Sequence, residues 1–222
     1  MLAVFAHPDD ETFSIGGTLR ALADHGIPCH LYCATDGDAG RSSGVPVSSR
    51  AELGAIRRNE LHTAATILGI QSVTCGGWPD GALATTNPDV VVAEIVREIR
   101  RLRPAVVITF GPEGAPTGHR DHRAISRMAT AAFFLASNPS ASPEHGEPFA
   151  ATQLLYFTWP PYPPAEKLMQ GMEPFHLTVD VREYREVRRH AFLADRTQRE
   201  HEPIFERIAN MDSESFYLAA SR

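Results

Sequence analysis

Cysteine is scarce in this chain, and long apolar runs are missing. The three cysteines, Cys29, Cys33 and Cys75, are an odd number without a disulfide-dense framework, so they predict free thiols in a reducing cytoplasm. No apolar run approaches the roughly 20 residues that span a bilayer. The first six residues are too few for the apolar region of a signal peptide and lack a basic leader, so we expect a cytoplasmic chain without a membrane span.

Positive charge is not in excess either. The formal net charge is −6 and the sequence pI is about 5.9, which gives no general attraction for nucleic acid or anionic lipid. No G-x-G-x-x-G follows a predicted strand and no P-loop motif occurs, which disfavours a nucleotide-binding module. The 222 residues, with 43% apolar composition, predict one globular domain over 1–222.

Short apolar runs alternate with helical patterns along the chain. This alternation predicts an α/β fold with a mostly parallel sheet and helices on both faces. The predicted strands are 2–6, 28–34, 73–76, 105–110, 153–158 and 175–179, and the predicted helices are 17–25, 50–68, 89–102, 122–136, 182–194 and 203–210. Ligands bind beyond the carboxyl ends of such strands, where the polar loops 7–11, 36–44 and 111–122 are expected.

The loop after the first strand concentrates charge. His7 is followed by Asp9, Asp10 and Glu11, and three adjacent carboxylates repel one another unless a cation or another partner is present. A helix N-terminus that the acidic residues cap is the alternative interpretation.

A second cluster, 118–122, follows another strand and favours a metal site. Zinc binds imidazole nitrogen and carboxylate oxygen, and a catalytic zinc commonly has three protein ligands and one open position. His7, Asp10 and His122 supply such a set for one Zn²⁺ per chain.

The neighbouring residues then gain roles in hydrolysis of an acyl bond. Asp9 is placed to take a proton from the water that the metal activates and to deliver it to the leaving amine. His119 is placed to donate to the oxyanion, and Asp121 to hold a neighbouring imidazole in its tautomer.

With these motifs the sequence resembles the zinc-dependent N-acetylglucosamine deacetylases of the PIG-L and LmbE-like group. The resemblance rests on Ala-His-Pro-Asp-Asp-Glu at 6–11, Thr-Asp-Gly at 35–37 with Ala-Gly at 39–40, Arg-Arg-Asn-Glu at 57–60 with Leu-Gly at 68–69, Pro-Asp-Gly at 79–81, and His-Arg-Asp-His at 119–122.

The resemblance implies a Rossmann-like fold, zinc on His7, Asp10 and His122, Asp9 as general base and His119 as charge stabiliser. It also implies sugar contacts from Arg57 and Asp80, and a small N-acetylated amino sugar conjugate as substrate. Arg57 or Arg58 as a plain helix-surface charge, and Asp80 as a turn residue, are the alternatives.

One position departs from the family pattern. Family members tend to have histidine before x-Ser/Thr-Gln near the carboxyl end, where this chain has Asp195 before Arg196, Thr197 and Gln198. Thr197 and Gln198 are candidates to line the pocket.

Other functions remain open from the sequence. A different amide, such as a thiol conjugate or an acylated antibiotic sugar, is the alternative substrate, and a non-catalytic ligand-binding module on the same fold is the alternative of another class. A homo-oligomer also stays open. The loop 159–164, Trp-Pro-Pro-Tyr-Pro-Pro, is expected to be stiff and to lie over the pocket.

Overall fold

The computed structural model describes residues 1–114, 116–158 and 177–222. The chain divides into two compact units. Unit 1 comprises Met1–Phe5, Ala82–Thr178 and Ser215–Arg222, and unit 2 comprises Ala6–Gly81 and Val179–Glu214.

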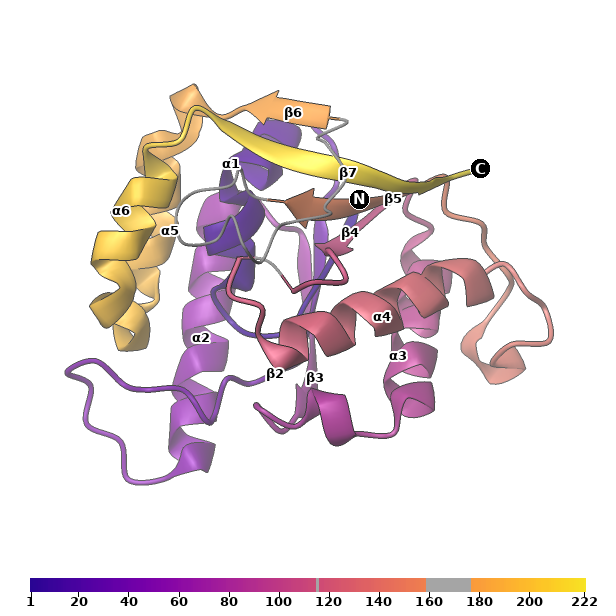
Figure 1. The fold of residues 1–222 in the computed structure, drawn as a ribbon, viewed down its shortest axis with the longest axis horizontal. Helices are drawn as coiled ribbons and strands as arrows, with labels where there is room; N and C mark the ends of the chain where they lie inside the picture. The colour runs from indigo at the N-terminus through magenta and orange to yellow at the C-terminus, as the bar shows by residue number, and fades with distance from the viewer. Residues whose placement is uncertain (115, 159–176) are drawn as a thin grey trace. The chain divides into compact units, whose positions relative to one another are not determined.

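Strands and helices alternate along most of the chain (Figure 1). The strands are β1 (Leu2–Phe5), β2 (His30–Thr35), β3 (Ser72–Trp78), β4 (Val106–Phe110), β5 (Gln153–Thr158), β6 (Leu177–Asp180) and β7 (Ser213–Ser221). The α-helices are α1 (Asp10–Asp24), α2 (Arg50–Leu68), α3 (Pro88–Leu102), α4 (Arg120–Leu135), α5 (Arg185–Ala194) and α6 (Glu202–Ala209). Short 3₁₀ helices are η1 (Leu83–Thr85), η2 (Pro143–His145), η4 (Arg182–Tyr184) and η5 (Arg196–His201).

The strands form a seven-stranded, mostly parallel sheet with helices, which confirms the predicted α/β, Rossmann-like class. Unit 1 contains the order β1-β4-β5-β7, in which β1, β4 and β5 are parallel and β7 runs antiparallel to β5. In unit 2, β2 pairs in parallel with β3.

The core of unit 1 is built from β1 and the inner faces of α3 and α4. All four residues of β1 are buried, as expected for a central parallel strand. Helix α3 has a buried apolar stripe at Val91, Ile95 and Ile99, with spacings of four residues. Helices α3 and α4 pack on each other and on β1 (Figure 1).

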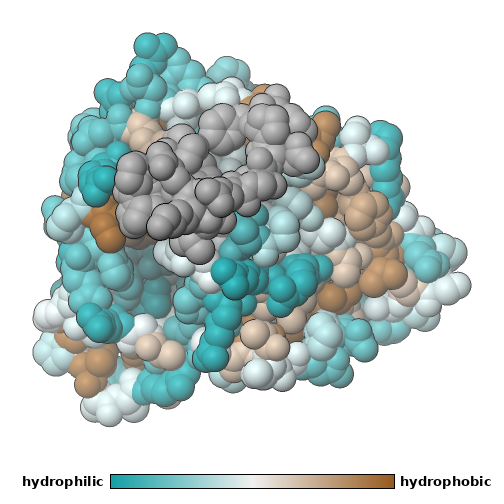
Figure 2. All heavy atoms as spheres, viewed as in Figure 1, coloured by the Kyte–Doolittle hydropathy of each residue, from teal (hydrophilic) through white to brown (hydrophobic). Residues whose placement is uncertain are grey.

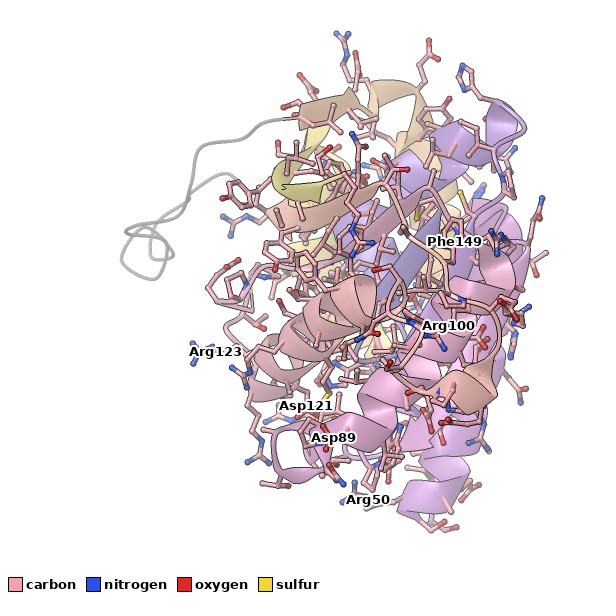
Figure 3. All side chains as sticks on the ribbon, turned by 90° about the vertical axis from the view of Figure 1, so that its right-hand side faces the viewer. Arg50, Asp89, Arg100, Asp121, Arg123 and Phe149 are labelled. Atoms are coloured by element: carbon pink, nitrogen blue, oxygen red, sulfur yellow. The ribbon has the colours of Figure 1, made fainter. Side chains whose placement is uncertain are left out.

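A buried arginine fixes the segment that follows α4 (Figure 3). Arg100 is 4% exposed, and its guanidinium donates hydrogen bonds to backbone carbonyls. These acceptors are Ala136, Asn138, Ala141, Ser142 and Gly146, at 2.7 to 3.2 Å. The cation thereby satisfies carbonyls at and beyond the carboxyl end of α4 that lack helical partners.

In unit 2, α2 has the bounds that the sequence predicts. Ser49 Oγ accepts from the backbone of Glu52, whose carboxylate accepts from Ser48, so the helix start is capped. At the other end Gly69 has φ 78°, the left-handed conformation that glycine adopts without a Cβ penalty. Helices α1, α2 and α5 pack together in this unit.

Helix α1 begins at Asp10, seven residues before the predicted start at residue 17. The helix is kinked at Ile15 (φ −136°), and the N–H groups of Gly17 and Thr18 donate to the buried carboxylate of Glu214 at 2.9 and 2.8 Å. A carboxylate almost 200 residues away therefore caps the second half of α1, which local pattern did not predict.

Strand β7 was not predicted at all. The predicted strand 175–179 overlaps β6 at 177–179, and its first two residues lie outside the described residues, as does the loop 159–164. None of the described helices is both long and apolar enough to cross a bilayer.

Candidate active site

The side chain of Asp10 is hydrogen-bonded to the backbone of the loop between β1 and α1. Asp10 Oδ2 accepts the N–H of Ala6 at 3.1 Å and that of His7 at 2.7 Å. Asp9, the residue before the helix, has φ 101° and ψ −26°. A positive φ at a residue with a Cβ costs roughly 1–2 kcal/mol, and such strain is concentrated at functional sites.

Arg57 holds this strained residue in place. The side chain is almost completely buried, and Nη2 donates to Pro8 O at 2.5 Å and to Asp9 Oδ2 at 3.0 Å. Nη1 donates to Gly37 O at 2.9 Å. The guanidinium therefore fixes both the backbone and the carboxylate of the predicted general base, while its contact with a sugar stays a prediction.

The imidazole of His7 lies between two carboxylates. Nδ1 is 3.4 Å from Asp10 Oδ2, and Nε2 is 3.2 Å from Asp80 Oδ1. Burial opposes ionisation of Asp80, but the hydrogen bond and charge of His7, together with the N–H of Ala39, outweigh it and lower the pKa of Asp80. Asp80 thus belongs to the His7 cluster, and its predicted sugar contact is untested.

The environment of Glu11, in the first turn of α1, favours the neutral form of its carboxyl group. Glu11 is fully buried, and burial raises its pKa to about 8, with Asp9 and Asp10 adding repulsion. A hydrogen bond from Thr12 opposes the shift. Crowded carboxylates beside an imidazole are a donor set that suits a divalent cation such as zinc.

Unit 1 contributes the second predicted cluster, at the start of α4. The N–H of Asp121 donates to His119 Nδ1 at 3.2 Å, so His119 caps the helix. This bond favours the tautomer with hydrogen on Nε2, which remains a donor without the imidazole being charged. Donation to an oxyanion, the role predicted for His119, therefore does not require a charged imidazole.

His122 lies one turn further on. It is 6% exposed and stacks on Phe110 at the end of β4, with ring centroids 4.0 Å apart and an interplanar angle of 10°. The His119 and His122 rings are 5.3 Å apart. Asp121, labelled in Figure 3, is fully buried, and the structure brings the three residues together within unit 1.

The family profile described as PIG-L, GlcNAc-PI de-N-acetylase, matches residues 2–133, more than half of the chain. The chain belongs to the PIG-L family. The profile covers both clusters, from the start of β1 to the last turn of α4.

Relatives within this family carry related names. A probable N-acetyl-alpha-D-glucosaminyl L-malate deacetylase 2 of Bacillus cereus is 38% identical over 133 residues, which is 60% of this chain and 60% of that protein. A 1D-myo-inositol 2-acetamido-2-deoxy-alpha-D-glucopyranoside deacetylase of Rhodococcus opacus is 33% identical over 177 residues, 70% of this chain and 60% of that protein. The chain thus spans about 60% of the length of these relatives.

The fold is shared with a solved structure. The N,N'-diacetylchitobiose deacetylase from Pyrococcus horikoshii has a TM-score of 0.80 and 22% identity, and the match covers 98% of this chain and 82% of that one. At this identity the likeness concerns the fold.

The position where the sequence departs from the family pattern is buried. Asp195 is 1% exposed; burial, together with repulsion from Glu11 and Asp9, raises its pKa well above the usual value, against a smaller opposing effect of Arg57. Burial among like charges therefore disfavours the ionised form of this carboxyl group.

Thr197 and Gln198, which follow Asp195, form hydrogen bonds to distant parts of the chain that the sequence did not predict. Thr197 donates from its backbone and hydroxyl to the two carboxylate oxygens of Glu60, at 3.0 and 2.6 Å. Gln198 Nε2 donates to Arg41 O, and Ser43 N donates to Thr197 O. Thr197 and Gln198 thus connect the loop after β2 to α2. Their role in lining a pocket stays a prediction.

We expect Asp195→Asn to stabilise the chain increasingly as pH rises from about 4 toward neutral. The folded-state pKa is raised above the unfolded value of about 3.9, so the native carboxyl keeps a proton that the unfolded chain releases, and stability falls through this window by up to about 1.4 kcal/mol per pH unit. The amide has no such proton. Urea denaturation at several pH values measures the effect, with exposed Asp24→Asn as control; a pH-independent difference contradicts it.

Proposed function

We propose that this chain is a zinc-dependent hydrolase that removes the N-acetyl group from an N-acetylglucosamine-type conjugate. The observation that carries the proposal is Asp9, which has a strained backbone and a carboxylate bound by Arg57. Two residues of metal-ligand type, His7 and Asp10, flank it in the chain. Membership of the PIG-L family supports the same chemistry.

In this proposal His7, Asp10 and His122 hold one zinc ion per chain. The donor set of two imidazoles and a carboxylate fits a catalytic zinc site. Bound there, zinc polarises an acyl carbonyl and makes water a nucleophile near neutral pH. The proposal treats residues 1–222 as a single deacetylase domain.

The chain's own residues then move the protons and stabilise charge. Asp9 accepts the proton of the attacking water and passes it to the leaving amine. His119 donates from Nε2 to the oxygen that gains negative charge, and Asp121 supports the neighbouring imidazole. The hydrogen bond from Arg57 holds the carboxylate of Asp9 in one orientation, so that less conformational freedom has to be lost before the reaction.

The substrate class follows from the relatives' names. Both named deacetylases act on an α-linked 2-acetamido-2-deoxyglucose that carries a small polar group, malate in one case and inositol in the other. We therefore propose a small conjugate of this type as substrate. We also propose that the enzyme works in the cytoplasm, where Cys29, Cys33 and Cys75 stay as the free thiols of the structure.

The test is amine release after removal and return of metal. The purified chain is stripped with a chelator, reloaded with zinc, checked for metal content and assayed on N-acetylglucosaminyl malate, N-acetylglucosaminyl inositol and other acetylated amides. We expect release only from the zinc-loaded chain and fastest from an α-glucosaminyl conjugate. A zinc-loaded chain that deacetylates none of these conjugates rules the proposal out, and preference for an unrelated amide supports the alternative amidase.

Gly37→Ala tests the role of Arg57 without substituting Arg57 itself. A Cβ on Gly37 would lie 2.2 Å from Arg57 Nη1 and 2.5 Å from its Cζ, so the buried guanidinium must move and Asp9 loses its support. We expect kcat to fall by about 10- to 100-fold. Gly44→Ala is the matched control, because Gly44 has φ +72°, close to the +65° of Gly37, and open space around it. Both variants should lose about 1–2 kcal/mol of stability from the positive φ; equal kcat values would contradict the role.

A further inference from the structure

Unit 1 contains an apolar groove whose lining includes none of the proposed catalytic residues. The groove has a volume of about 410 Å³ and runs between η1, the first turns of α3, and α4. Its floor is formed by Leu83, Val92, Ala124 and Met128, all of them buried. None of these residues has a role in the proposed reaction.

Exposed hydrophobic side chains lie on both of the helices that line this groove. Figure 2 shows hydrophobic residues in brown where Figure 1 draws the carboxyl-terminal part of α4. Phe134 is 51% exposed there and Leu135, which lines the groove, 37%; Val90 on the first turn of α3 is 45% exposed. Grouped exposure of large apolar side chains marks interaction surfaces, whereas single exposed residues do not.

The exposed ring of Phe134 is contacted by two neighbouring side chains, those of Phe133 and Arg222. Its ring meets that of Phe133 edge-on at 5.2 Å, and the guanidinium of Arg222 lies 5.7 Å from its centroid. A preorganised aromatic side chain loses little conformational entropy when it enters a partner's pocket. The same helix thus carries both a projecting aromatic ring and a groove.

The rim of the groove carries one charge of each sign. Asp89 and Arg127 both line it and both are exposed, and neither forms an ion pair within the part of the chain that the structure describes (Figure 3 labels Asp89). In a two-fold dimer every contact between two different residues occurs twice. Asp89 and Arg127 of one copy could therefore both form ion pairs, with Arg127 and Asp89 of the other copy.

We propose that this groove is the interface of a two-fold symmetric homodimer. Phe134 of each copy enters the groove of the other, and Arg127 of each copy pairs with Asp89 of the other. A small amphiphile in the groove would use the apolar floor alone. It would leave Phe134 exposed and would meet charges of both signs, so a second copy accounts for more of the surface.

Charge reversal tests the interface. The full chain and the variants Asp89→Arg, Arg127→Asp and the double reversal are compared by sedimentation velocity over a range of concentrations, with Arg207→Asp on α6 as a matched control for a lost exposed arginine. We expect each single reversal to weaken the dimer about tenfold or more, because like charges then face each other twice. The double reversal should restore association, and the control should leave it unchanged.

Two results would overturn the proposal. One is a chain that stays monomeric at every concentration, including a monomer whose melting temperature rises with an alkyl carboxylate, which would assign the groove to a small ligand. The other is a dimer that none of the reversals weakens. Circular dichroism melts of each variant separate loss of association from loss of folding, and the double reversal provides a second check.

Discussion

Asp9→Asn is expected to lower kcat by about 10²- to 10⁴-fold while zinc stays bound, the range attributed to a positioned general base. The amide has nearly the shape of the carboxylate but cannot accept the proton of the attacking water. Because Asp9 is not one of the three proposed ligands, the metal content should remain one zinc per chain. Steady-state amine release and metal analysis on the same preparation measure both quantities.

Asp24→Asn is the matched control for this variant. Asp24 also forms an ion pair with an arginine, Arg20, but the pair lies on the exposed end of α1. Its loss should change neither kcat nor zinc content, since exposed pairs contribute little. An Asp9→Asn enzyme with kcat like that of the Asp24 control would show that another group moves the proton.

The contrast between Asp9 and Arg57 shows how far the sequence predicts this site. The His7–Glu11 cluster could be found because its residues are consecutive and follow a buried strand. The support from Arg57 could not, because it depends on how α2 packs beside the loop almost 50 residues earlier. Resemblance to the family suggested a sugar contact for Arg57, and only the structure gives its bonds to Asp9 and two carbonyls.

The elements show the same division between local and distant causes. Helix α2 was predicted with the bounds it has, because a serine cap and Gly69 are local signals. Strand β7 was missed: its Ser, Glu and Ala residues have little strand preference, and it exists because it pairs antiparallel with β5. The kink in α1 likewise depends on Glu214, far along the chain.

Removal of a proposed ligand from either sequence cluster should abolish zinc binding, and this is the largest effect we expect. His7→Asn and His122→Asn each leave two of the three proposed ligands. Changes in residues that merely orient a ligand typically cost 10- to 100-fold in affinity, so loss of the ligand itself should cost at least about 100-fold. Activity at limiting zinc should fall in parallel, since water activation depends on the metal.

The zinc affinities of the two variants also show whether both histidines are ligands. His7 follows β1 and His122 lies in the first turn of α4, so equal losses would mean that both sequence clusters supply a ligand. His62→Asn is the matched control, because His62 is an exposed histidine on α2 outside both clusters. Zinc titration with a competing chelator measures the affinity of each protein. If only His7→Asn loses zinc, His122 is not a ligand, and the stacking of His122 on Phe110 would then be its structural role.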